Sequence, residues 1–125
     1  MIFLKSGVYI NMGRKVEYTS RYMRAVKVCK KKHLDLKPLH DIEIILAERP
    51  FTQDEIIKYN VHKLTGNWAG YMELHIGNKS SNWLLVYRIV GNAVKFEDTY
   101  VVLENTGTHD ECLGSIEVDN ELIWI

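Results

Sequence analysis

The sequence has few cysteines, no long apolar run and no export signal, and each shortage excludes a class of protein. Its two cysteines, Cys29 and Cys112, lie far apart and form no CxxC motif, which favours reduced thiols over a disulfide. No stretch approaches the roughly 20 apolar residues that a membrane-spanning helix needs. The N-terminal apolar segment is interrupted by Lys5, and no small-residue cleavage site follows it. We therefore expect a cytoplasmic protein without a membrane segment.

Net charge is also absent, because 16 basic residues balance 16 acidic ones, but the charges are unevenly distributed. Residues 1–70 hold 13 Lys and Arg against 7 Asp and Glu, whereas residues 71–125 hold 3 against 9. Basic residues are densest between positions 21 and 32. Such a cluster is either a solvated helix face or a surface that binds nucleic-acid phosphates through counterion release. The candidates for RNA or ribosome contact are Arg21, Arg24, Lys27, Lys31 and Lys32.

Helical periodicity is confined to the first half of the chain. A short strand around Val16 is followed by a helix over 21–33, capped by Thr19 or Ser20 and ended before Pro38. A second helix is expected over about 39–47, and the residues 52–55 resemble a capping box that opens one short turn. The core-facing residues of the two helices are Tyr22, Val26, Cys29, His33, Leu39, Ile42, Ile45 and Leu46.

After Gly70 the hydrophobic period changes to two, which predicts strands. Residues 71–76 alternate, so Glu73 and His75 are expected on the face opposite Leu74. Further strands are expected over 83–89 and 93–103, joined by a hairpin at Gly91-Asn92 and interrupted at Glu97-Asp98. The predicted fold is α+β in the order β-α-α-β-β-β, with two helices packed on a mostly antiparallel sheet of four or five strands. One domain is expected over 1–125, with extensions at 1–13 and at 115–125, the latter a terminal strand or docking segment.

Three of the five histidines are candidates for chemistry. His62 lies just before a turn, His75 lies on the polar face of a strand, and His109 lies in a loop after the last long strand. Cleavage of RNA by its own 2′-OH needs a base, an acid and a positive charge for the phosphorane, and three imidazoles can supply all of these. Their spacings of 13 and 34 residues match no zinc motif. Unrelated structural histidines remain an alternative, and packing or helix-dipole roles suit His33 and His40.

The aromatic residues divide into two groups. Core packing is the expected role of Trp83 and Tyr87, which lie in the apolar strand. Trp68 and Tyr71 lie near a loop, where stacking on RNA bases competes with packing.

The segments around the three histidines resemble the YafQ branch of the RelE/ParE toxin superfamily. They read HKLTGNWAGYMELHI from His62, NWLLVY from Asn82 and TGTH ending at His109, in the family's order. Residues 16–18 and the basic helix also resemble its first strand and helix, so the resemblance covers about residues 14–114. It implies a RelE-like fold and a ribosome-dependent mRNA endonuclease, the toxin of a type II toxin–antitoxin pair.

The resemblance also implies an active site without a metal or cofactor. Its catalytic histidines fall on His62, His75 and His109. Its supporting positions fall on Asn82, Trp83, Asn105 and Leu113, where the family has an acidic residue, tryptophan, arginine and an aromatic residue. The implied partners are mRNA, the ribosome and a cognate antitoxin of the ribbon-helix-helix type.

The replacements at Asn82 and Asn105 leave an alternative open. Asparagine carries no positive charge for the phosphorane, so the site implied at position 105 is weakened. The alternative is a catalytically weakened or inactive relative that acts by binding an antitoxin or another target such as gyrase.

Overall fold

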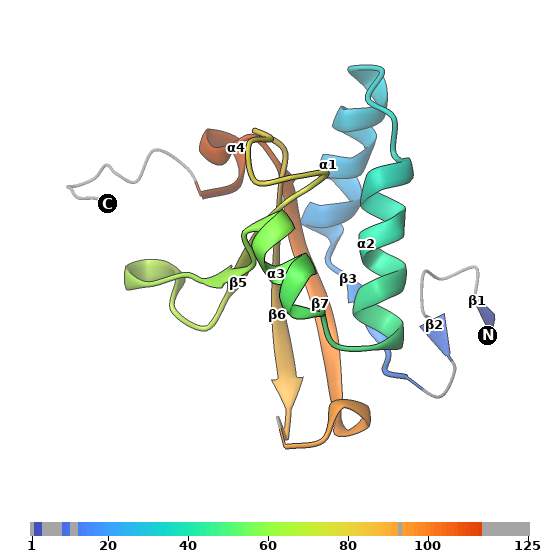
Figure 1. Ribbon diagram of the computed structural model, residues 1–125. Helices are drawn as coiled ribbons and strands as arrows, with labels where there is room; N and C mark the ends of the chain where they lie inside the picture. The colour runs from blue at the N-terminus through green and yellow to red at the C-terminus, as the bar shows by residue number, and fades with distance from the viewer. Residues whose placement is uncertain (1, 4–8, 11–12, 93, 114–125) are drawn as a thin grey trace.

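The computed structural model describes residues 2–3, 9–10, 13–92 and 94–113, and it contains one five-stranded mixed sheet covered on one face by helices (Figure 1). The order of strands in the sheet is β3-β7-β6-β5-β4, in which β3 and β7 are parallel and the other pairs are antiparallel. The elements are β1 (Ile2–Phe3), β2 (Tyr9–Ile10), β3 (Val16–Tyr18), α1 (Ser20–Lys31), α2 (Lys37–Glu48), α3 (Gln53–Tyr59), β4 (His62–Lys63), η1 (Gly66–Trp68), β5 (Met72–His75), β6 (Leu84–Gly91), η2 (Phe96–Asp98), β7 (Thr99–Gly107) and α4 (His109–Leu113). This confirms the predicted fold class.

Helix α1 begins where the sequence predicts and ends earlier. The Thr19 side chain caps it by accepting a hydrogen bond from the Tyr22 backbone N–H at 2.9 Å. Tyr22 and Cys29 are buried, as their spacing predicts. The inward position predicted for His33 is wrong, because the helix ends at Lys31 and His33 adopts a left-handed backbone with φ of 63°. Its side chain is therefore exposed rather than part of the apolar stripe.

Helices α2 and α3 are both longer than predicted. Helix α2 starts at Lys37 because Pro38 lies in its first turn, where the missing N–H is not needed. Leu39, Ile42 and Leu46 are buried as expected, and Ile45 is half-buried. In α3 the capping box of Thr52 and Glu55 is present, but it opens a seven-residue helix instead of one short turn. This helix carries the chain from α2 to the edge strand β4.

The last strand also begins later than predicted. The expected interruption at Glu97-Asp98 is present as the 3₁₀ helix η2, so β7 starts at Thr99 and not near residue 93. The connection between β6 and β7 is therefore longer than a two-residue hairpin. A register shift between Val86 and Tyr87 lets Glu104 bulge from β7. The predicted loop around His109 is instead the short helix α4.

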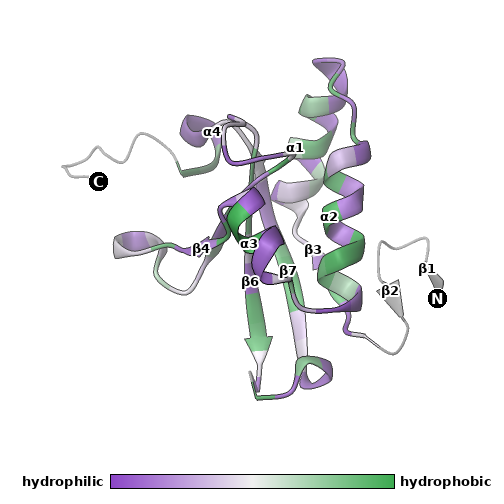
Figure 2. Ribbon diagram, viewed as in Figure 1, coloured by the Kyte–Doolittle hydropathy of each residue, from purple (hydrophilic) through white to green (hydrophobic). Residues whose placement is uncertain are grey.

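The core is divided between the two faces of the sheet. On the helix-covered face the strand residues Leu74, Leu85 and Leu103 pack with buried residues of α1 and α2. On the other face, which we call the open face, Leu84 and Val86 form a smaller cluster with α4. Figure 2 shows β6, which contributes to both clusters, as mainly hydrophobic.

Two predictions concern segments at the ends of the chain. The two-residue strands β1 and β2 pair with each other and form a separate small sheet. The expected terminal strand or docking segment at 115–125 lies outside the described residues. None of the helices in the described ranges combines the length and the apolar character needed to cross a bilayer.

Candidate active site

The register of the strands brings the predicted site residues onto the open face. His62 pairs with Glu73, which pairs with Val86, which pairs with Asn105. Residues paired across antiparallel strands point to the same side of a sheet. The row His62–Glu73–Val86–Asn105 therefore shares the open face, opposite the buried Leu74 and its helix-facing neighbours.

His62 is the end of this row and lies in the two-residue strand β4, just before the turn that contains η1. Its Nε2 lies 3.2 Å from Oε1 of Glu73, and its Nδ1 donates to the backbone oxygen of Asn60 at 2.6 Å. A carbonyl oxygen only accepts, so Nδ1 carries a hydrogen. The ring can donate to both oxygens only when both of its nitrogens carry hydrogen.

Glu73 is the functional candidate that the sequence reasoning missed. It is buried, and its Oε2 has no hydrogen-bond partner within the part of the chain that the structure describes. A buried carboxylate oxygen without a partner is costly, which suits a functional group more than a packing one. The available signal was a single carboxylate within the apolar alternation of residues 72–76, two positions before His75 and on the same face.

His75 is held by a similar backbone contact. Its Nδ1 donates to the backbone oxygen of Ser81 at 2.7 Å, and the ring is half-buried. This contact fixes the tautomer, so the neutral ring presents Nε2 as an acceptor. The opposite neighbour of His75 on β6 is Leu84, which pairs in turn with Gly107.

His109 reaches the same end of the sheet from α4. It is the first residue of that helix, two residues after Gly107, and its side chain is 64% exposed. Gly107 lies two strand spacings, roughly 10 Å, from the strand of His75. The three histidines thus lie on β4, β5 and α4, and His62 is three strand spacings, roughly 14 Å, from the strand of Gly107. No hydrogen bond or ion pair joins any two of them in the part of the chain that the structure describes. Within the described ranges, no group of three or more His, Cys, Asp or Glu side chains is arranged to hold a metal ion.

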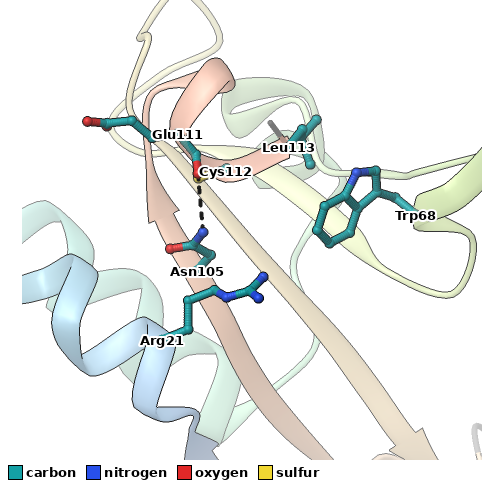
Figure 3. A pocket seen from close by; sticks show the side chains of 6 residues that line it. All are labelled: Arg21, Trp68, Asn105, Glu111, Cys112 and Leu113. Atoms are coloured by element: carbon teal, nitrogen blue, oxygen red, sulfur yellow. Dashed lines mark hydrogen bonds between the residues drawn. The ribbon is translucent and has the colours of Figure 1, made fainter. Parts of the chain in front are cut away.

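Asn105 and Leu113 meet in a cavity of about 390 Å³ between α1, β7 and α4 (Figure 3). The buried Asn105 side chain donates to the Glu111 backbone oxygen at 3.4 Å and accepts from the Thr106 backbone N–H at 2.9 Å. Leu113 is buried in the open-face cluster, and burial raises the pKa of the neighbouring Cys112 thiol to about 12. Through its hydrogen bond to the Glu111 backbone oxygen, the Asn105 side chain links β7 to α4.

Asn82 and Trp83 line a different cavity, of about 400 Å³, with Lys32 and Glu111. Asn82 is exposed in the loop before β6. The indole N–H of Trp83 donates to the hydroxyl of Thr106 at 3.0 Å, and its ring packs against the helix-covered core. Tyr87 is buried in that core, as predicted.

Trp68 and Tyr71 pack together on the open face. Their rings meet edge to face with 5.4 Å between centroids, and both lie against the cluster of Leu84 and Val86. Trp68 also lines the cavity of Asn105, and its buried indole N–H is without a partner among the residues the structure describes. Packing accounts for Tyr71, whereas Trp68 serves both the cluster and the cavity wall.

The basic residues of the first helix are exposed, and one of them is paired. Arg21, Arg24, Lys27 and Lys31 of α1 are exposed, and Arg21 and Arg24 border a cavity beside β7. Lys32, directly after the helix, forms an ion pair with Glu111 of α4 at 2.9 Å. Its charge is therefore partly neutralised, whereas Arg21, Arg24, Lys27 and Lys31 form no ion pair with any residue that the structure describes.

Comparison with known proteins places this architecture among bacterial toxins. A family model described as a bacterial toxin of type II toxin–antitoxin systems, YafQ, matches residues 14–114. The mRNA interferase toxin YafQ of Escherichia coli strain K12 is 29% identical over 101 residues, which cover 81% of this chain and 97% of that protein. The crystal structure of YafQ from E. coli strain BL21(DE3) has a TM-score of 0.62 at 26% identity, covering 77% of this chain and 93% of that one. The toxin in the E. coli DinJ–YafQ toxin–antitoxin complex has a TM-score of 0.60 at 29% identity, covering 78% and 93%.

Proposed function

The chain belongs to the YafQ family of type II toxin–antitoxin toxins, and from this membership we propose that it is a metal-independent mRNA interferase. The observation that carries the proposal is the pair His62 and His75. Both rings lie on one sheet face, and both are fixed by donating Nδ1–H to a backbone oxygen. Two imidazoles oriented in this way suit acid–base chemistry, which depends on correct placement of the ring nitrogens.

The reaction is attack of a ribose 2′-OH on the adjacent phosphorus. His75 takes the 2′-OH proton at Nε2, and the bond from phosphorus to the 5′ oxygen breaks. His109, whose side chain is exposed at the start of α4, gives a proton to that leaving oxygen. The products are a 2′,3′-cyclic phosphate and a 5′-hydroxyl.

His62 lies beside the reacting groups as a positioned imidazole, and its contact with Glu73 partly neutralises any positive charge that it carries. When its two nitrogens both carry hydrogen, the ring donates to Asn60 and Glu73 at once. Glu73 therefore acts as a positioning residue, because it holds the ring rather than touching RNA.

The partners follow from the family and from the charge distribution. A relative was crystallised with its antitoxin DinJ, and we propose a cognate antitoxin of the ribbon-helix-helix type for this chain. In this proposal the chain binds the ribosome through the exposed basic residues of α1. Its substrate is mRNA that is being translated in the cytoplasm. Neutralising Lys27 and Lys31 should weaken ribosome binding and flatten its salt dependence by about one unit of slope per lost phosphate contact.

The test is cleavage of a translated mRNA in a cell-free system, mapped by primer extension. His109→Ala should lower the cleavage rate by about 10²–10⁴-fold, the usual contribution of one general acid. His33→Asn is the matched control, because it replaces an exposed histidine at the far end of α1 that the reaction does not use. A His109→Ala variant that cleaves as fast as the wild type would exclude the proposed acid.

A second candidate function is favoured by Asn105. Its amide is buried, uncharged and engaged with the backbone of α4 and β7, so it cannot neutralise a phosphorane. An inactive relative that titrates an antitoxin would tolerate this residue. A wild-type chain that binds antitoxin and leaves translated mRNA intact would favour this second function.

A further inference from the structure

Arg21 is set apart from the other basic residues of α1 by the space it enters. It is the second residue of the helix, and it lines the cavity with Asn105 and Trp68. It also lines an adjoining cavity of about 380 Å³ with Arg24 and Asn105. Figure 3 shows its side chain leaving α1 and extending beside Asn105 toward Trp68.

The guanidinium of Arg21 is available for a ligand. In the described part of the chain it takes part in no hydrogen bond or ion pair, whereas Lys15, Lys32, Lys37 and Arg49 are all paired with carboxylates. An unpaired guanidinium beside a cavity presents a planar fork of donors that matches phosphate oxygens.

Among the described residues that line the cavity, Glu111 is the acidic one, and its charge is already engaged. Its Oε2 pairs with Lys32 at 2.9 Å, and its Oε1 accepts from the Thr108 backbone N–H at 2.8 Å. These contacts lower the pKa of Glu111 and keep it ionised without recruiting Arg21. The cavity therefore retains the positive charge of Arg21.

The wall of the cavity opposite Arg21 is suited to binding a nucleobase. Trp68 presents a ring that lines the cavity across from Arg21 (Figure 3), and aromatic rings stack on bases of any sequence. The volume of about 390 Å³ lies within the range of small-ligand pockets. A phosphate at Arg21 with a base at Trp68 corresponds to one nucleotide of a single strand.

We propose that Arg21 binds an RNA phosphate in this cavity, supplying from α1 the positive charge that Asn105 lacks. The proposal rests on the proposed nuclease function and adds to it a nucleotide subsite formed by Arg21, Asn105 and Trp68. It differs from general attraction of RNA to α1, because the cavity orders one phosphate beside a defined pair of side chains.

The experiment titrates purified protein with a 2′-O-methyl RNA tetranucleotide, which cannot be cleaved, and follows it by NMR. The side-chain amide of Asn105 and the indole N–H of Trp68 report on the cavity. We expect both signals to shift with the wild type. Arg21→Gln should raise the dissociation constant roughly 10- to 100-fold, which is the effect of losing hydrogen bonds to a charged group. Arg21→Lys should be intermediate, because an ammonium cannot bind phosphate through a planar fork.

Lys95→Gln is the matched control. It removes the same charge from an exposed residue in the connection between β6 and β7, which Figure 1 shows at the end of these strands away from α4. This variant should change the dissociation constant less than twofold. An Arg21→Gln variant that binds as tightly as the wild type would overturn the proposal. Equal weakening in both variants would also overturn it, since it would show nonspecific attraction.

Cleavage of translated mRNA is measured in parallel, so that the two proposals fail separately. If the wild type cleaves and Arg21→Gln cleaves equally well, the role of Arg21 is wrong and the nuclease stands. If the wild type binds the tetranucleotide through Arg21 and cleaves nothing, the nuclease is wrong and the subsite stands. Thermal unfolding of each variant checks that the fold is kept, as expected for exposed residues.

Discussion

The two faces of the sheet differ in whether their buried polar side chains have hydrogen-bond partners. On the helix-covered side, the carboxylate of Glu43 receives hydrogen bonds from the hydroxyl of Tyr22 and from Nδ1 of His40. On the open face, Oε2 of Glu73 and the indole N–H of Trp68 are buried, and no partner for either is found in the described ranges. Among the described residues, the buried side-chain polar atoms without a hydrogen-bond partner are therefore on the open face.

This difference separates the part of the molecule that stabilises the fold from the part available for chemistry. A buried polar group without a partner costs about 1–3 kcal/mol. The open face therefore gives up stability at the row that contains His62 and Asn105. Polar groups left without partners in this way are expected where a ligand completes the bonding.

The strongest test of the comparison uses two neighbouring leucines on β6. Leu85 points into the helix-covered core and Leu84 into the open-face cluster, and both are buried. Leu85→Ala should lower the free energy of unfolding by about 3–5 kcal/mol, and Leu84→Ala by about 2–3 kcal/mol, because the smaller cluster collapses more easily. Urea denaturation measures both.

The two variants should rank in the opposite order when cleavage activity is measured instead of stability. At a temperature where both are folded, Leu84→Ala should cleave mRNA more slowly than Leu85→Ala, because Leu84 supports α4 and its His109. Equal activity in the two variants would mean that the open face is not specialised.

The next test compares the two buried glutamates. Glu43→Gln should lower the free energy of unfolding by about 1–3 kcal/mol, because it weakens charge-assisted hydrogen bonds with Tyr22 and His40. Glu73→Gln should change it by less than about 1 kcal/mol, because a neutral amide is easier to bury than a carboxylate with an unpartnered oxygen.

Cleavage should reverse that order. Glu73→Gln should lower the cleavage rate by about tenfold or more through loss of the charged contact that orients His62, and Glu43→Gln should leave it within about twofold. If Glu73→Gln were as active as the wild type, Glu73 would have no positioning role.

The helix-covered face was predictable because its signals are local. The spacing of Tyr22, Val26 and Cys29, and the alternation from Met72 to Ile76, each identify a buried side without knowledge of the partner. The same local rules failed at His33, where the chain leaves the helix through a left-handed residue. Helix termini depend on the final turn, which periodicity does not report.

The open face was only partly predictable because its contacts are long-range. Alternation placed Glu73 and His75 on one face, but Cys112, whose thiol interacts electrostatically with Glu73, belongs to α4, which the sequence analysis expected to be a loop. Arg21 and Asn105 meet only because α1 packs on β7, 84 positions later in the chain. The sequence motifs therefore identified candidate site residues such as Asn105. The neighbouring residues that determine their roles could be identified only from the tertiary structure.

The smallest effect concerns α3, which connects the helix layer to the edge strand of His62. Arg49 and Glu55 meet at 2.7 Å, and Glu55 also accepts from the Thr52 backbone N–H. The Arg49 contact, together with this capping bond, lowers the pKa of Glu55 from 4.5 to about 2. Because the folded pKa is the lower one, this stabilisation is present above pH 4.5 and is lost as the pH falls toward 2.

Glu55→Gln keeps the capping geometry and removes the charge. It should lower the free energy of unfolding at pH 7 by at most about 1 kcal/mol, because Arg49 is largely exposed and the pair is screened. The difference from the wild type should shrink between pH 4.5 and 2, measured by urea denaturation. Asp54→Asn removes a charge from the same turn without breaking the Arg49 pair and serves as the control. A Glu55→Gln difference that stays constant over this pH range would mean that the pair does not stabilise α3. The position of His62 would then depend on its sheet contacts with Glu73 alone.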